Sequence, residues 1–253
     1  MQAHGPFSWR RATVGGNVGN MDFPDSEIVA LPAGPTRVSW RRSLRARRVS
    51  LRIDPRDGGV IVTLPPRASR RAGLALLMGH ADWVSARIES LPSASPLADG
   101  AVVPLHGVPH RIAHVPGGRG GAWIAEGEIR VSGEPEFRAR RVTDLLRREA
   151  RRGLAAIVAA KAGQAGLRPG RITVKDTRTR WGSCAANGNL AFSWRLVMAP
   201  PYVQDYVAAH EVAHLRHMNH GELFWRLVAE LTPHREAARI WLRDGGPVLL
   251  RVG

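Results

Sequence analysis

The chain has 253 residues, of which 44% are hydrophobic, enough for one domain with a sizeable core or for two small ones. Its net charge of +16 comes almost entirely from arginine, because Lys161 and Lys175 are the only lysines. A basic surface attracts polyanions, but the arginines are dispersed and the aromatic residues few, so nucleic acid is a partner that these features do not favour. The single cysteine, Cys184, excludes an intramolecular disulfide and a cysteine-based metal cluster.

No apolar run is long enough to cross a membrane, and the N-terminus lacks the apolar core of a signal peptide. We therefore expect a cytoplasmic protein with no membrane partner. Residues 1–27 are rich in glycine and polar residues and show no period, which predicts a disordered leader, and Met21 is a candidate for the true start.

Residues 28–135 are predicted to form a β-rich N-terminal region. Three short alternating runs predict antiparallel strands over residues 37–40, 49–53 and 60–64. Ser69 can cap a following helix whose apolar residues continue to Ile88. After a connection rich in proline and serine, four further strands are expected over residues 101–105, 110–115, 122–125 and 128–131.

Residues 136–253 are predicted to form a helical, metal-binding catalytic region. A long amphipathic helix is expected over residues 137–166, packed against the metal-binding helix. Asn187-Gly188 predicts a hairpin turn before a strand over residues 189–194. Short helices are expected over residues 223–231 and 235–242.

The segment His210-Glu211-x-x-His214 is the strongest chemical signal in the sequence. Two histidines four residues apart lie on one face of a helix, so both imidazoles can bind the same zinc ion. The side chain of Glu211 lies about 100° around the helix axis from that of His210, so it need not bind the metal. It is therefore predicted to act as the general base on a water that the zinc activates.

A catalytic zinc site usually has a third protein ligand, and His220 is the first candidate. An unbroken helix would turn this residue about 240° away from His214, so the helix must end before it. Asn219 and Gly221 tolerate the left-handed conformation that ends helices, so the chain can turn back here. The rival ligands are His217, Glu222 and Glu230.

The segment before the hairpin is the candidate substrate-binding region. Gly182 and Ser183 are small enough to let a substrate backbone approach an edge strand. Arg178 and Arg180 could bind a carboxylate or phosphate, and one of them could stabilise the oxyanion formed during attack.

These features together resemble the YgjP-like family of bacterial zinc metallopeptidases, relatives of the SprT-like zincins. The resemblance covers roughly residues 37–241, and its motifs are Arg180-Trp181-Gly182-Ser183-Cys184, Leu190 to Leu196, Tyr206 to Leu215, and Asn219-His220-Gly221 followed by Phe224-Trp225. It implies that His210, His214 and His220 bind zinc and that Glu211 is the catalytic base. A nucleoside triphosphate pyrophosphatase activity has also been attributed to a member.

We therefore expect an α+β, zincin-like fold and a zinc-dependent metallopeptidase that acts on a peptide or protein. One alternative is a metal-dependent nucleoside triphosphate pyrophosphatase whose arginines bind phosphate. Another is a nucleic-acid or partner-binding module in which a fourth protein ligand makes the zinc structural. The sequence does not predict the substrate specificity or the oligomeric state.

Overall fold

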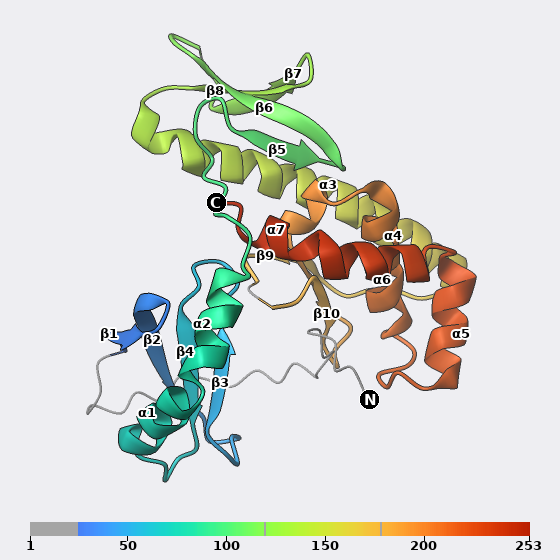
Figure 1. Ribbon diagram of the computed structural model, residues 1–253. Helices are drawn as coiled ribbons and strands as arrows, with labels where there is room; N and C mark the ends of the chain where they lie inside the picture. The colour runs from blue at the N-terminus through green and yellow to red at the C-terminus, as the bar shows by residue number, and fades with distance from the viewer. Residues whose placement is uncertain (1–24, 119, 178) are drawn as a thin grey trace. The chain divides into compact units, whose positions relative to one another are not determined.

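The computed structural model describes residues 25–253 except residues 119 and 178 (Figure 1). The predictions for Met21, for residues 1–24 of the leader and for Arg178 therefore lie outside the described residues. Packing divides the described chain into two compact units, residues 25–94 and residues 95–253. This division falls within the segment predicted as the β-rich region. The predicted α+β class is confirmed, with β-sheets toward the N-terminus and helices toward the C-terminus.

The first unit contains a four-stranded sheet with the order β1-β2-β4-β3. Its strands are β1 (Ser26–Leu31), β2 (Gly34–Arg42), β3 (Ser50–Ile53) and β4 (Val60–Leu64). The prediction that these strands are all antiparallel is wrong, because β2 and β4 pair in parallel. The prediction assumed that strands consecutive in the sequence pair with each other, whereas here β4 lies between β2 and β3.

Two helices, α1 (Arg70–Gly79) and α2 (Ala81–Glu89), pack against one face of this sheet. Ser69 caps α1 as predicted, since its Oγ accepts a hydrogen bond of 3.2 Å from the backbone N–H of Ala72. The predicted single helix is interrupted at His80, whose φ of −121° is not helical. The buried residues of this small core come from the sheet and both helices, and include Val38, Val62, Leu64, Leu77 and Val84.

The second unit begins with a four-stranded sheet of the order β5-β6-β8-β7. Its strands are β5 (Val102–Leu105), β6 (Val108–Val115), β7 (Ala122–Ala125) and β8 (Glu128–Ser132). The central pair, β6 and β8, is parallel, and both outer pairs are antiparallel. This is the topology of the first sheet, including a two-residue turn between the first two strands and a helix after the fourth.

A 3₁₀ turn, η1 (Pro135–Phe137), leads into the 28-residue helix α3 (Arg138–Ala165), which Gly166 ends in the left-handed conformation. Figure 1 shows α3 running from the β5–β8 sheet to the helices of the C-terminal part, and it packs against both. The predicted packing of this helix against the helix that carries His210 is confirmed. Its buried face, which includes Leu146, Leu154 and Val158, belongs to the larger core.

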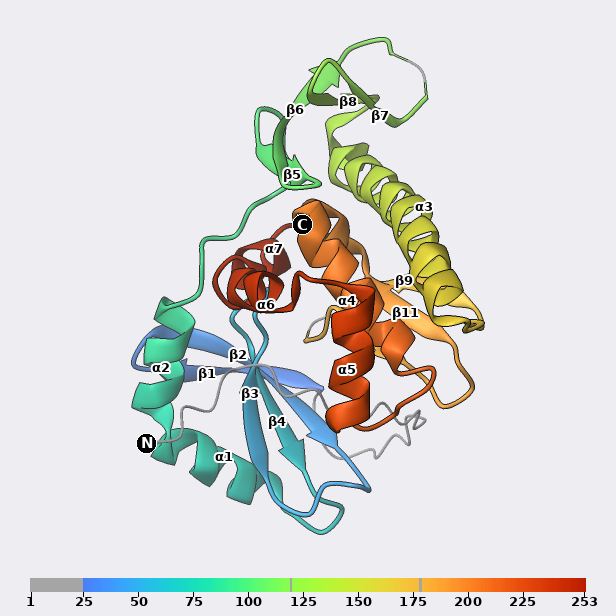
Figure 2. The same cartoon turned by 90° about the vertical axis from the view of Figure 1, so that its right-hand side faces the viewer.

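The site is built from a small sheet and four helices (Figure 2). The sheet has the order β10-β11-β9, with β9 (Ile172–Lys175), β10 (Gly182–Cys184) and β11 (Leu190–Ser193). A 3₁₀ segment, η2 (Trp194–Met198), leads to α4 (Pro201–Ala213), α5 (Glu222–Leu231), α6 (Arg235–Asp244) and α7 (Gly246–Leu250). In the described part of the chain no helix has both the length and the apolar character needed to cross a membrane.

Helix α4 is the most deeply buried of these helices, and polar side chains fix its position. Lys161 of α3 lies 2.7 Å from the carboxylate of Asp205 on α4 and donates a hydrogen bond of 2.6 Å to the carbonyl of Leu231 on α5. Gln204 donates to the carbonyls of Val197 and Ala199 in the preceding segment. These bonds hold α4 between α3 and α5, and so they set where its histidines lie.

Candidate metal centre

The chain leaves α4 at the second histidine, His214, which is the C-cap of the helix. The last residue of α4 is Ala213, and its carbonyl accepts a hydrogen bond of 3.0 Å from the N–H of His217. The expected end of the helix before His220 is therefore present. The proposed cause is wrong, because neither Asn219 nor Gly221 has a positive φ. Gly221 instead has an extended conformation, with φ −79°, at the start of α5.

This loop brings the three histidines together. The Nε2 atoms of His210 and His220 are 3.2 Å apart, and one ring nitrogen from each of His210, His214 and His220 lies within 4.8 Å of the others. Among the residues that the structure describes, this is the one grouping of His, Cys, Asp or Glu that could hold a metal ion. Three nitrogen donors on two elements match the ligand set of an open catalytic metal site.

The rival ligands lie outside the group. The backbone carbonyl of His217 is 3.0 Å from Nδ1 of His214. If Nδ1 carries the proton it donates to this carbonyl, which leaves the lone pair of His214 Nε2 free for a metal. Glu222 and Glu230 are exposed on α5. The structure thus gives His217 a backbone role in orienting His214.

Aromatic rings enclose the histidines. Phe224 is fully buried, and the centroid of its ring lies 4.6 to 4.9 Å from those of all three histidines. Trp225 stacks on His220 with a centroid distance of 5.6 Å and an interplanar angle of 25°. These rings restrict how far the imidazoles can turn, so the donor atoms are held in place before a metal arrives.

Burial also keeps the imidazoles neutral. Burial, together with the neighbouring His214 and His220, lowers the pKa of His210 to about 2. Burial likewise lowers the pKa of His214 and of His220. Near neutral pH all three rings are therefore unprotonated, which is the form that binds a metal.

Glu211 lies beside this group without belonging to it. Its side chain is buried, and Oε1 has no hydrogen-bond partner among the described residues. Burial raises the pKa of Glu211 to about 8, and the nearby positive charge of Arg180 acts in the opposite direction. A buried carboxyl with an unpaired oxygen and a perturbed pKa, next to a set of metal donors, is typical of a catalytic acid or base.

Gly182 explains how Glu211 fits. A Cβ atom at Gly182 would lie 2.5 Å from Oε1 of Glu211 and 2.6 Å from its Cγ. Strand β10 can therefore approach α4 this closely only with glycine at this position. The neighbouring Ser183 is half-buried, and Arg180 lies just before the strand. The predicted contact of these residues with a substrate stays a prediction.

A sequence model of the YgjP-like family, described as a metallopeptidase domain, matches residues 47–245. The chain belongs to the YgjP-like family. The activity class that the family supports is a peptidase that uses a metal ion.

Two further comparisons add little. Among solved structures, the zymogen of abylysin, a metallopeptidase from Pyrococcus abyssi, is 19% identical to this YgjP-like chain. The match covers 36% of this chain and 95% of that one, with a TM-score of 0.33, which is too low to support an argument. No curated protein matches the chain.

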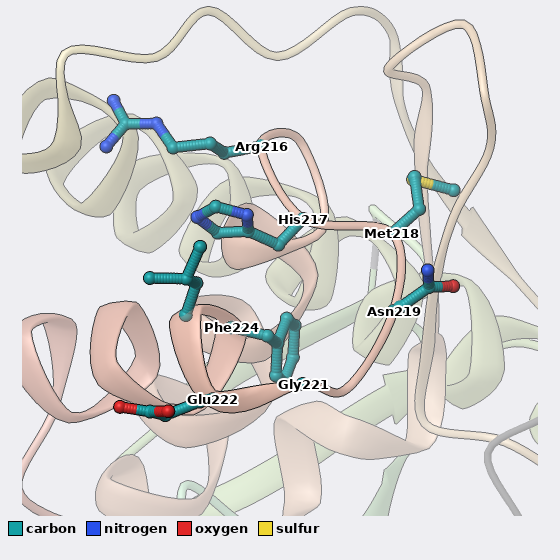
Figure 3. Close-up of a pocket in the computed structure, with 8 residues that line it drawn as sticks. Arg216, His217, Met218, Asn219, Gly221, Glu222 and Phe224 are labelled. Carbon is teal, nitrogen blue, oxygen red and sulfur yellow. The ribbon is translucent and has the colours of Figure 1, made fainter.

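A pocket of about 390 Å³ lies at the loop after α4 of this YgjP-like protein (Figure 3). Its walls come from the loop after α4 and the start of α5, and include Arg216, His217, Asn219 and Phe224. The three histidines and Glu211 are not among its lining residues. The pocket is therefore not the candidate site of chemistry.

Sequence reasoning missed one cationic residue near the metal centre. Arg235, the first residue of α6, places its guanidinium carbon 4.0 Å from the ring centroid of Trp225. Its positive charge is one of the groups that lower the pKa of His210. No local signal could have identified it, because Arg235 and Trp225 lie on different helices and share no motif.

Proposed function

We propose that this YgjP-like protein is a zinc-dependent peptidase in which His210, His214 and His220 bind the metal and Glu211 is the general base. The observation that carries the proposal is the convergence of three neutral imidazoles beside a buried carboxyl that is not one of their group. Zinc suits a set of three nitrogen donors with a remaining open position, whereas magnesium and calcium prefer oxygen donors.

Bound zinc would polarise the substrate carbonyl and lower the pKa of a water molecule in the site. Glu211 takes the proton of the attacking water and later gives it to the leaving amine. It must be ionised to accept this proton. The positive charge of Arg180 and of a cation held by the histidines both stabilise the ionised form.

Strand β10 is the proposed site for the peptide backbone. Within the small sheet, β10 pairs with β11 on one side only. Its other edge can form main-chain hydrogen bonds with an extended peptide, which would then pass beside Glu211. Arg180, just before this strand, is the proposed donor to the oxyanion that forms on the scissile carbonyl.

The hydrolysis of a nucleoside triphosphate is a second candidate. Arg180 lies close enough to Glu211 to affect its pKa, and Arg235 lies close enough to affect that of His210, so the site carries positive charge that could hold phosphate. Against this candidate, the three nitrogen donors do not suit the magnesium ion that usually accompanies triphosphates.

A zinc-loaded preparation of the wild type, compared with Glu211→Gln, tests the function on a diverse peptide library analysed by mass spectrometry. Nucleoside triphosphates are assayed in parallel, and the zinc content of both proteins is measured. We expect peptide cleavage that the substitution reduces by at least a factor of about 100, with one zinc retained in both proteins.

Other outcomes separate the alternatives. Triphosphate hydrolysis that depends on Glu211, without peptide cleavage, would establish the second candidate. Tight zinc binding with neither activity would favour a binding module in which the metal is structural.

A further inference from the structure

Arg235 is held at the edge of the metal centre by an aromatic ring. It begins α6, and its guanidinium carbon lies over the Trp225 ring of α5 at 4.0 Å from the centroid. A guanidinium held over an indole ring is stabilised by the cation–π attraction, and its N–H groups remain able to donate to a ligand. The contact therefore fixes the orientation of a side chain that would otherwise be flexible.

Trp225 links this guanidinium to the metal ligands. Its ring centroid lies 5.6 Å from that of His220 and 5.9 Å from that of His210. The guanidinium carbon can therefore be no farther from the His210 ring centroid than its 4.0 Å distance to the Trp225 centroid plus the 5.9 Å between the Trp225 and His210 centroids. An extended residue spans at most about 3.3 to 3.6 Å, so a substrate group bound to Arg235 would lie within about three residues of the scissile bond.

The outer nitrogens of Arg235 are not used by the protein. Nε is buried, and its nearest carboxylate oxygen is Oε1 of Glu236 at 3.4 Å. Across the described residues, neither Nη1 nor Nη2 of Arg235 has a hydrogen bond or an ion pair. Arg239 and Arg243 on the same helix differ, because their outer nitrogens are engaged: Nη1 of Arg239 pairs with Glu236, and Nη2 of Arg243 donates to Asp244. Arg235 is thus the cation of α6 that is fixed by packing and still has donors to offer.

We propose that Arg235, supported by Trp225, binds a carboxylate of the peptide substrate beside the metal centre. Two parallel N–H donors of a guanidinium match the two oxygens of a carboxylate. The group could be the C-terminal carboxylate of a peptide or the side chain of Asp or Glu. This inference rests on the proposed peptidase function and adds a substrate class to it: peptides with a negative charge within about three residues of the cleaved bond.

The test uses peptide hydroxamates, whose hydroxamate group binds zinc, and measures their affinity for the zinc-loaded full chain by calorimetry. One pair differs only in Asp against Asn near the hydroxamate, and a second pair differs only in a free C-terminal carboxylate against an amide. We expect the wild type to bind one carboxylate form about 10- to 100-fold more tightly than its amide partner. The pair that shows this preference identifies the source of the carboxylate.

Five variants, one of them a control, assign the preference to this site. Arg235→Gln should bring the ratio close to one while leaving the affinity for the amide compound unchanged. Arg235→Lys, which keeps the charge without the fork of donors, should retain part of the ratio. Trp225→Leu should reduce the ratio more than Trp225→Phe, since only Phe keeps a ring face. Arg243→Gln, at an exposed position of the same helix, is the control and should keep the full preference.

The outcomes separate this inference from the proposed function. If the wild type cleaves peptides but binds both members of each pair equally, the carboxylate subsite is overturned and the peptidase stands. If no peptide is cleaved but the carboxylate preference is present and depends on Arg235, the subsite stands and the peptidase function fails. A carboxylate preference that persists in Arg235→Gln overturns the inference.

Discussion

Gly182 and the carboxyl of Glu211, the proposed general base, approach each other closely in the candidate site. Glu211 fits beside β10 because Gly182 has no side chain, and an added Cβ would lie 2.5 Å from Oε1 of Glu211. No ordinary packing allows such a distance, so Gly182→Ala must move the carboxyl or the strand. A displacement of about 1 Å of a catalytic group can reduce a rate about 100-fold.

We therefore expect Gly182→Ala to lower kcat about 100-fold while the protein still binds one zinc, since the three histidines lie on α4 and the following loop. Steady-state kinetics and metal analysis measure both effects. Gly163→Ala on α3 is the matched control, because its added Cβ would meet no atom within 4 Å. It should keep full activity. Undiminished turnover by Gly182→Ala would show that the position of Glu211 is not critical.

The carboxyl of Glu211 should also destabilise the metal-free protein. The ordinary pKa of a glutamate side chain is 4.5, and burial raises the pKa of Glu211 to about 8. The folded state thus holds a proton more tightly than the unfolded state, so its stability falls as the pH rises from 4.5 toward 8. A catalytic group kept at such a cost is typical of an active site.

Glu211→Gln removes the charge, so the metal-free variant should be more stable than the wild type above pH 8, by an amount on the order of a few kcal/mol. The difference should shrink toward pH 4.5. Denaturant unfolding at about pH 5 and about pH 8.5 measures it, with Glu230→Gln, an exposed residue of α5, as the control. A difference that is the same at both pH values would contradict the raised pKa.

At the scale of elements, residue periodicity and turn motifs predicted most helices and strands. They could not predict which strands pair when those strands are not consecutive in the sequence. Helix α3 was expected over residues 137–166 and spans Arg138–Ala165, and the Asn187-Gly188 hairpin is present between β10 and β11. The parallel pairing of β2 with β4 was not foreseen, because the intervening strand lies at the outer edge of the sheet. Strand β1 was missed because it begins at Ser26, inside the segment that was predicted to be a disordered leader.

The candidate site shows the same limit. Spacing alone placed His210 and His214 on one helix face and required the helix to end before His220. It could not show that the turn uses extended backbone at Gly221, that the carbonyl of His217 lies against His214, or that Gly182 makes room for Glu211. Each of these features depends on how two elements approach each other, and the spacing of residues within one segment carries no information about that approach.

The helices around the site are joined by Lys161. Its ammonium group reaches both Asp205 of α4 and the carbonyl of Leu231 on α5. Lys161→Met would leave both partners without this donor in a largely buried place, and we expect the free energy of unfolding to fall by about 1 to 3 kcal/mol.

Denaturant unfolding measures the loss. The matched control is Arg152→Met on the same helix, where the side chain is 79% exposed and pairs with Glu149. Exposed pairs contribute little, so this variant should change stability by less than about 1 kcal/mol. Equal losses in both variants would mean that the Lys161 contacts do not hold the helices together.

At the scale of the whole molecule, the chain repeats one sheet topology and builds two separate cores. The sheets β1-β2-β4-β3 and β5-β6-β8-β7 have the same order and the same parallel centre. The smaller core draws on residues from Val29 to Ile88, and the larger one begins at Leu97. All four residues of the candidate centre belong to the second unit.

A fragment of residues 95–253 should therefore fold and bind zinc without the first unit, because its core shares no residue with the other core. We expect one equivalent of zinc and a cooperative unfolding transition, measured by metal analysis and circular dichroism, with His220→Ala in the fragment as the control for specific binding. The family match includes residues 47–94 of the first unit, so the fragment lacks part of the matched region. If the fragment folds but binds no zinc, the metal centre depends on the first unit, and the division into two independent cores does not describe how the site is stabilised.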